Sequence, residues 1–302
     1  MEIETGFDRP LQFTVDAHNV RGRLVRLGPV LQEVLAAHSY APVAEKLLAE
    51  SLVLTALLGA TLKDPESQLT IQAQTGGGPI DLLVCDWKGG GLRGYLKFDP
   101  DRLVEAGSNP SLFALFGGGF LAITFDQATS GERYQGIVPL EGNGIGAAAE
   151  HYFEQSEQIP SLIRIAARHG ADEGCVAGGL LLQHLPEGEI GRERLHVRHD
   201  HPEWAHARTI AATLADAELT DPALALERIA WNLFHEDEVR VEPGLNLTKG
   251  CRCSIAHFSR VLAQFPLDQR LEMADDDGII PVDCAFCSRI FPIALDAIDP
   301  SQ

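Results

Sequence analysis

Four cysteines near the end of the chain form two close pairs, and their spacing constrains the fold more than any other feature. Cys251 and Cys253 are separated by one residue, Cys284 and Cys287 by two, and 30 residues lie between the pairs. Each pair can donate two thiolates to one metal ion, so the two pairs together complete a tetrahedral site. Thiolates favour zinc or iron–sulfur clusters over magnesium or calcium, and one four-cysteine set in a reducing compartment favours zinc. We therefore predict one Zn²⁺ per chain, bound by these four residues.

The segment that carries the cysteines is too small to fold on its apolar core alone. Residues 249–302 number only 54 and include an acidic stretch at residues 275–277. A chain this short seldom buries enough apolar surface to be stable without a disulfide or a metal. A structural zinc site supplies roughly 10–16 kcal/mol of binding free energy, which is also folding free energy. Oxidation of the thiolates should therefore unfold this segment.

The four cysteines have three other readings: static disulfides, a catalytic zinc and a permanent zinc ribbon. Static disulfides need an oxidising compartment, and residues 1–7 lack the basic and apolar regions of a secretory signal. A catalytic zinc needs an open coordination position, and four thiolates leave none. Spacing alone leaves the permanent ribbon open. However, Cys-x-Cys is much rarer in ribbons than Cys-x-x-Cys. A disulfide between its two cysteines would close a small, strained ring, which indicates a reversible disulfide.

Charge disfavours two classes of partner. The 302 residues include 24 Lys and Arg against 43 Asp and Glu, a net charge of −19. Nucleic acids and anionic membrane surfaces both select for basic proteins. Of two apolar stretches, residues 51–62 are too short to span a bilayer, and residues 107–125 are interrupted by Pro110 and by glycines 117–119. We expect a cytoplasmic protein with no nucleic-acid or membrane partner.

The first two thirds of the chain alternate between strand patterns and glycine turns. Strands are predicted at residues 11–15, 69–74, 80–87, 92–98, 120–125, 133–138 and 176–185. Helices are predicted at residues 43–62, 147–155 and 161–169. Glycine turns at residues 76–79 and 89–91 join consecutive strands, which indicates an antiparallel meander. This order predicts an α+β domain over residues 1–195, with a mostly antiparallel sheet plus helices.

The character of the chain changes near residue 200. Residues 200–248 contain three Arg against ten Asp or Glu. Two amphipathic helices are predicted there, with the stripes Trp204, Ala207, Ala211, Leu214 and Leu226, Ile229, Ala230, Leu233, Phe234. Asp221-Pro222 is a start signal for the second helix. Two short helices cannot form a core of their own, so we expect them to pack on the first domain. The predicted division is a core domain at 1–195, a helical linker at 196–248 and a zinc module at 249–302.

The remaining motifs are weaker. Residues 142–147 match G-x-G-x-x-A, but residues 139–141 separate them from the preceding strand, and a helix is predicted where a dinucleotide site needs a second strand. The histidines His196, His199, His201 and His206 lack a strong ligand spacing and are interpreted as a solvated loop. Cys85 and Cys175 are interpreted as small buried hydrophobes. The sequence offers no convincing active site, and we expect a protein that is not an enzyme.

Several segments, in order along nearly the whole chain, match one known pattern. The most specific are Cys251-Arg252-Cys253-Ser254 and Cys284-Ala285-Phe286-Cys287; the others are residues 20–27, 69–72, 134–141, 152–158, 178–183 and 233–241. Together they resemble the redox-regulated heat-shock holdase chaperones of the bacterial 33 kDa chaperonin family. Phe291 departs from that family, which commonly has Tyr there. The difference bears on a hydroxyl hydrogen bond and not on the metal site.

The resemblance implies an ATP-independent chaperone that holds unfolding client proteins. In the reduced state four thiolates bind zinc and the linker stays docked. Peroxide or hypochlorite then joins Cys251 to Cys253 and Cys284 to Cys287, zinc leaves, and the module and linker loosen. The active form in this family is commonly a homodimer.

Holding unfolded clients requires apolar surface that is hidden while the protein is inactive. We expect that surface to include Trp204, Leu226, Ile229, Leu233 and Phe234, docked on the first domain in the reduced state. The alternative is a constitutive zinc-stapled interaction or regulatory protein, whose protection of clients would not change on oxidation.

Overall fold

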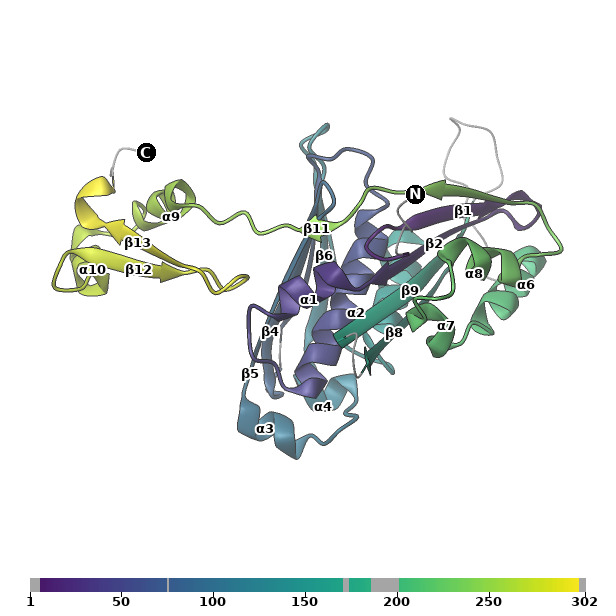
Figure 1. The fold of residues 1–302 in the computed structure, drawn as a ribbon, viewed down its shortest axis with the longest axis horizontal. Coiled ribbons are helices and arrows are strands. Elements are labelled where there is room, and N and C mark those ends of the chain that lie inside the picture. The colour runs from purple at the N-terminus through teal and green to yellow at the C-terminus, as the bar shows by residue number, and fades with distance from the viewer. Residues whose placement is uncertain (1–5, 75, 171–173, 186–200, 299–302) are drawn as a thin grey trace. The chain divides into compact units, whose positions relative to one another are not determined.

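The computed structural model describes residues 6–74, 76–170, 174–185 and 201–298, and the chain divides into two compact units (Figure 1). The first unit comprises Met1–Leu35 and Ser39–Gly250, and the second comprises Ala36–His38 and Cys251–Gln302. By packing, the helical segment after residue 200 therefore belongs with the first unit. The division into a domain at 1–195 and a linker at 196–248 stays a prediction, and its boundary at 195/196 lies outside the described residues. Within the described part of the chain, no helix is long and apolar enough to cross a membrane.

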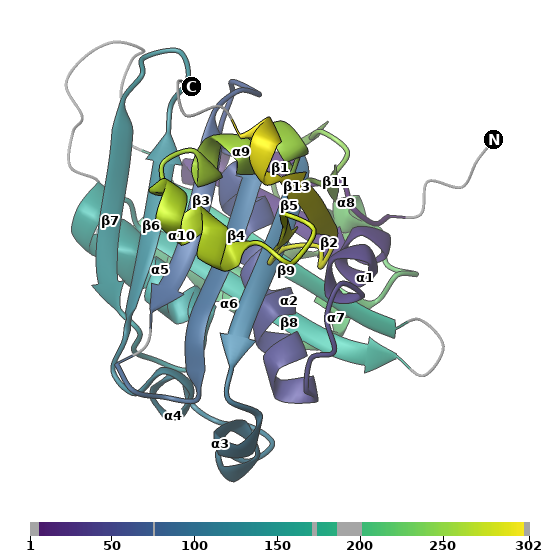
Figure 2. The ribbon, with the colours of Figure 1, turned by 90° about the vertical axis from the view of Figure 1, so that its left-hand side faces the viewer.

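Two sheets build the first unit (Figures 1 and 2). The first is antiparallel and has the order β10 (Val239–Pro243), β1 (Leu11–Val15), β2 (Val20–Leu27), β9 (Gly174–His184), β8 (Ser161–Gly170). The second has the order β11 (Thr248–Lys249), β5 (Gly91–Phe98), β4 (Ile80–Lys88), β3 (Gln68–Gln74), β6 (Phe120–Asp126), β7 (Arg133–Pro139). All its pairings are antiparallel except β11 with β5. The expected α+β class and the β3–β4–β5 meander are confirmed.

One apolar helix occupies the space between the two sheets. This helix, α2 (Pro42–Gly59), contacts β2, β8 and β9 of the first sheet and β3, β4 and β5 of the second. Apolar side chains all around it explain why the sequence pattern was that of a helix buried on most sides. The same core includes residues of α1 (Pro29–Leu35) and α5 (Ile145–Tyr152). Helix α5 continues as a π-helical turn over Phe153–Glu157. Two short helices, α3 (Pro100–Glu105) and α4 (Leu112–Phe116), connect β5 to β6.

Three helices cover the other face of the first sheet. They are α6 (Pro202–Ala212), α7 (Asp216–Thr220) and α8 (Leu226–Leu233), and their apolar side chains share one buried cluster with β1, β2, β8 and β9. The expectation that these helices pack on the first domain is therefore confirmed. The predicted start at Asp221 is wrong, because its side chain accepts a hydrogen bond from Ala223 N (2.9 Å) and closes a turn. Helix α8 begins only at Leu226, and α7 was not predicted.

Residues 161–169, predicted as a helix, form strand β8. Apolar side chains on both faces of the strand obscure its alternation. Ile163 belongs to the core around α2, whereas Leu162 and Ala166 belong to the cluster under α6–α8. Strands β7 and β8, on either side of the glycine motif at 142–147, lie in different sheets. That motif is therefore not part of a parallel βαβ dinucleotide-binding unit.

The second unit is small. It contains α9 (Ile255–Leu262), α10 (Leu267–Met273) and a hairpin of β12 (Ile279–Asp283) with β13 (Ile290–Ala294). Its core consists of four buried side chains, Leu262, Ile280, Ile293 and Ile298, with a few half-buried neighbours. A core of this size gives little hydrophobic stabilisation. The unit therefore needs the additional cross-link that its cysteines are suited to provide.

Candidate metal centre and linker docking surface

The four cysteines of the second unit converge from two places in its fold. Their sulfur atoms all lie within 4.8 Å of one another. Cys251 and Cys253 directly precede α9, which is capped by Ser254, whose Oγ accepts a hydrogen bond from His257 N (3.2 Å). Cys284 and Cys287 lie in the turn between β12 and β13. Pairs that are distant in the sequence thus meet at one point, as their spacing predicts.

The turn after β12 is shaped by hydrogen bonds to its own first residue. Cys287 N and Ser288 N donate to Cys284 O at 3.1 and 2.8 Å, and Cys284 N donates to Arg289 O at 3.0 Å. Ser288 has a φ of 55°, which turns the chain back into β13. This tight turn directs two thiols separated by only two residues towards the same point.

The sulfur separations fit a tetrahedral metal site. Cys251 Sγ is 3.3 Å from Cys253 Sγ and 3.6 Å from Cys284 Sγ, and Cys253 Sγ is 3.5 Å from Cys287 Sγ. With zinc–sulfur bonds of about 2.3 Å, the corners of the tetrahedron lie about 3.8 Å apart. All six cysteines of the chain are free thiols. The four can hold a metal ion, and their separations are too similar to favour one disulfide pairing. The pairs 251–253 and 284–287 stay predictions.

The thiols also influence one another's ionisation. Burial raises the pKa of Cys251, but hydrogen bonds from Cys253, Cys287 and Cys284 outweigh this effect and lower it to about 7. Burial and hydrogen bonding within the cluster raise the pKa of Cys253 and of Cys284. Cys251 therefore loses its proton more easily than Cys253 or Cys284. A bound cation would supply the positive charge that four neighbouring thiolates require.

Phe291, where the resembling family commonly has Tyr, lies on β13 of the second unit. It is 8% exposed, and its ring centroid is 5.2 Å from that of Phe258 on α9. The Arg289 guanidinium lies 5.5 Å from the Phe291 ring centroid. The ring therefore packs α9 against the hairpin through its contact with Phe258, and the cation–π contact with Arg289 lies within the hairpin itself.

The predicted client residues form a buried surface, which we call the linker stripe: Trp204, Leu226, Ile229, Leu233 and Phe234. Ile229 and Phe234 are each 1% exposed, Trp204 and Leu226 are buried, and Leu233 is half-buried. The Phe234 ring centroid is 5.9 Å from that of Phe13 on β1. The stripe is thus docked on the first sheet as expected. Its role in binding clients stays a prediction.

A buried arginine that sequence reasoning missed fastens the linker helices to the sheet. Arg26 on β2 donates hydrogen bonds to the carbonyl oxygens of Leu219 (2.8 Å), Leu224 (2.9 Å) and Glu218 (2.9 Å). Close by, a Cβ at Gly178 of β9 would lie 2.2 Å from Leu219 O, so only glycine allows α7 to approach this closely. No local pattern in the sequence identifies either contact, because each joins residues far apart in the chain.

The end of the linker adds a strand to each sheet, which was also not predicted. Strand β10 pairs antiparallel with β1, and Val241 lies opposite Phe13. Strand β11 pairs with β5 over two residues, and Gly250 N then donates to Leu92 O at 2.6 Å. The linker therefore covers the edge of the first sheet as well as its face.

The minor candidates are also placed. His196 and His199 lie outside the described residues. His201 is half-buried, with its ring centroid 5.2 Å from that of the buried His184, so it does not lie in a solvated loop as predicted. His206 is exposed on α6 and lies 5.1 Å, ring to ring, from His18. Cys85 and Cys175 are buried as predicted, and burial raises the pKa of both, that of Cys175 to about 12.

The chain is similar over almost its whole length to proteins named 33 kDa chaperonin. The family model described as Hsp33 protein matches residues 8–293. The 33 kDa chaperonin of Caulobacter vibrioides is 38% identical over 288 residues, which are 93% of each chain. That of Yersinia pestis is 37% identical over 282 residues, 93% of this chain and 90% of the relative. The crystal structure of the heat shock protein 33 homologue of Thermotoga maritima has the same fold, with a TM-score of 0.77 over 96% of each chain at 22% identity. Family model and relatives agree, and the chain belongs to the Hsp33 family.

Proposed function

We propose that this protein is a redox-regulated chaperone that holds unfolding proteins without using ATP. The names of its relatives support a chaperone function. The redox part rests chiefly on one observation, the convergence of four thiols in a unit whose apolar core is a cluster of only four buried side chains. In a unit of that kind, the state of the sulfurs decides whether the chain stays folded.

In the reduced state, Cys251, Cys253, Cys284 and Cys287 would hold Zn²⁺. The ion, when bound, supplies the charge that keeps four thiolates together and cross-links the start of α9 to the β12–β13 turn. The linker stripe is then buried on the first sheet, and Arg26 holds the backbone of α7. With the linker stripe covered, this apolar surface cannot reach a client, and the protein is inactive.

Oxidation removes the cross-link. For each close pair, two thiolates give two electrons to one molecule of hydrogen peroxide, whose O–O bond breaks; with two protons from solvent, one disulfide and two waters form. The pairs proposed are Cys251 with Cys253 and Cys284 with Cys287. Disulfide sulfurs carry no negative charge and no longer hold the ion, so the second unit loses most of its stabilisation.

Loss of order in the second unit then reaches the linker. The two-residue strand β11 ends at Lys249, and only Gly250 separates it from Cys251. When β11 and β10 detach, the linker stripe and the face of the first sheet beneath it become available to unfolding clients. We further propose that the active form is a homodimer and that it acts in the cytoplasm, where reduced thiols persist.

The test is the aggregation of a heat-unfolding client, followed by light scattering with reduced and with peroxide-treated protein. Only the oxidised protein should suppress scattering, with or without ATP, and a reductant should reverse the effect. The Cys85→Ser variant is the matched control, because its thiol is buried in the core of the first unit, and it should respond like the wild type. Equal protection by both redox states would refute the switch and leave the constitutive zinc-stapled interaction protein.

A further inference from the structure

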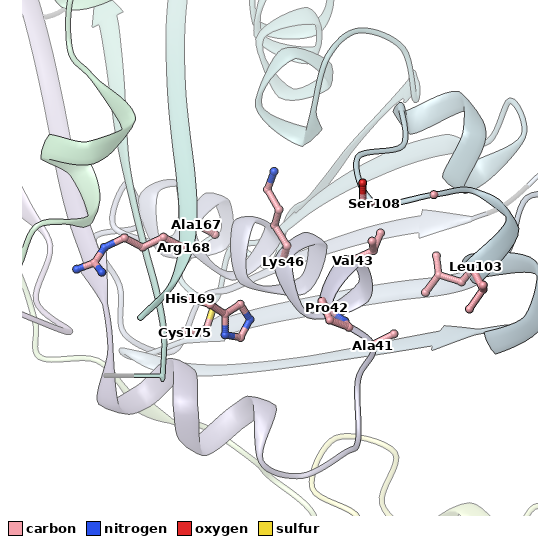
Figure 3. A pocket seen from close by; sticks show the side chains of 12 residues that line it. Ala41, Pro42, Val43, Lys46, Leu103, Ser108, Ala167, Arg168, His169 and Cys175 are labelled. Atoms are coloured by element: carbon pink, nitrogen blue, oxygen red, sulfur yellow. The ribbon is translucent and has the colours of Figure 1, made fainter. Parts of the chain in front are cut away.

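Three side chains of the first unit lie close enough together to hold a metal ion, and two of them line a cavity (Figure 3). Glu45 comes from α2, His169 from β8 and Cys175 from β9. One ligand atom of each, a carboxylate oxygen, an imidazole nitrogen and the thiol sulfur, lies within 4.8 Å of the other two. His169 Nε2 is 3.1 Å from a carboxylate oxygen of Glu45. The group is therefore already assembled by the packing of α2 on the sheet.

The cavity gives this group access to solvent. It has a volume of about 580 Å³ and is lined by, among others, Pro42, Lys46, Leu103, His169 and Cys175. Cys175 is 3% exposed, whereas the side chain of His169 is 51% exposed. In Figure 3 the Cys175 sulfur and the His169 ring lie side by side. A cation can thus enter from the cavity side, and a water molecule has room beside it.

We propose that Glu45, His169 and Cys175 bind a divalent cation of borderline softness, such as Zn²⁺ or Co²⁺, with a cavity water as the fourth ligand. Sulfur, nitrogen and oxygen donors together suit such ions and disfavour Mg²⁺ and Ca²⁺. The thiol of Cys175 loses its proton to solvent on binding, so a thiolate and a carboxylate neutralise the two positive charges.

The basic residues near the cavity do not occupy the site. Figure 3 shows the side chains of Lys46 and Arg168 directed away from His169 and Cys175. Lys46 Nζ lies 3.8 Å from a carboxylate oxygen of Glu50, and Arg168 Nε donates to Thr220 O at 3.2 Å. With three protein ligands and an exposed histidine, this site binds more weakly than the four-cysteine site, so mild chelation empties it first.

The experiment is a Co²⁺ titration of the reduced, full-length protein, after one equivalent of zinc has filled the four-cysteine site and mild chelation and desalting have removed any other metal. Binding should add one cobalt per chain and a near-ultraviolet thiolate-to-cobalt charge-transfer band. Cys175→Ser should abolish the band. His169→Gln and Glu45→Gln each remove a ligand. Loss of a residue that only supports a ligand lowers metal affinity roughly 10–100-fold, so these variants should lower it by at least that factor. Cys85→Ser, also a buried thiol, is the matched control and should retain the band.

Two results would overturn the proposal. If no extra cobalt binds, the three residues form only an ion pair next to a buried thiol. If the band persists in Cys175→Ser, cobalt has replaced zinc among the four cysteines. Because the readout is metal binding and not client protection, it is independent of the proposed chaperone function. His169 is largely exposed, so His169→Gln should fold normally and keeps the test valid should Cys175→Ser be unstable.

Discussion

Arg26 allows the docking of the linker to be tested by one substitution. Its guanidinium makes three hydrogen bonds to the backbone around α7, and the whole side chain is buried. We expect Arg26→Met, which keeps the apolar volume but removes the donors, to loosen the linker while the four-cysteine site stays intact. The reduced variant should therefore protect clients in part, without any oxidant.

The size of the effect follows from the contacts. A hydrogen bond from a charged donor contributes about 1.5–3 kcal/mol. Burial opposes this, since it lowers the pKa of Arg26, although the nearby Asp221 offsets part of that shift. We take about 3 kcal/mol as the net loss of docking free energy from three such bonds. That loss corresponds to about a 150-fold increase in the fraction of molecules with a released linker.

Hydrogen exchange of the backbone amides in α7 and α8 measures this fraction directly, because their exchange requires opening. The reduced, metal-loaded Arg26→Met variant should exchange these amides about 150-fold faster than the wild type, and those of α2 at an unchanged rate. Arg164→Met is the matched control. Arg164 is one-third exposed and bonds Ala212 O and Asp216, so its loss should cost about 1 kcal/mol or less. Wild-type exchange in α7 and α8 of Arg26→Met would refute the idea that this side chain holds the linker.

Three further predictions concern the module, the linker and the stripe. After mild chelation and desalting, reduced protein should contain one zinc per chain by elemental analysis; Cys284→Ser with Cys287→Ser should lose it, and Cys85→Ser or Cys175→Ser should keep it. Limited proteolysis should cut oxidised protein first between about residues 200 and 302 and leave a stable N-terminal fragment; identical patterns in both redox states would contradict the coupling of module and linker. Replacing Ile229 and Leu233 with Ser should weaken docking by on the order of 2 kcal/mol for each fully buried side chain, and less for the half-buried Leu233, so that the reduced, zinc-loaded variant protects clients partially in the aggregation assay. A folded, zinc-loaded double variant that stays inactive until oxidised would show that the stripe does not control docking.

Elements whose conformation depends on nearby residues could be predicted from the sequence. The strand at residues 11–15 was predicted to the residue because its apolar side chains alternate, and the helix predicted over residues 43–62, a long apolar run, is present over residues 42–59. The four cysteines were also assigned correctly to one cluster, since two close pairs have few other geometric solutions. Residues 161–169 were mistaken for a helix because both faces of that strand are covered, so that the period of two was lost.

Contacts between distant segments were beyond such reasoning. Nothing near Arg26 in the sequence indicates that its partners lie more than 190 positions away. The pairing of β10 with β1 depends on where the linker helices lead the chain. Likewise Glu45, His169 and Cys175 share no motif, and only the packing of α2 between two sheets brings them together. In each case tertiary structure creates a site that has no signature in the sequence.

The way in which the linker leaves the first unit has a mechanical consequence. Its attachments follow one another in chain order from the metal centre: the amide of Gly250, the two residues of β11, the five of β10 and then α8. A chain pulled or loosened at Cys251 therefore detaches by peeling, in which one small group of bonds bears the load at a time. Shearing would require all of these bonds to break together. Peeling divides one large barrier into several small ones, and the smallest attachments, the Gly250 amide and β11, come first. In the proposed switch, this order of attachments would let a change at four sulfur atoms release a helical segment that is otherwise well buried.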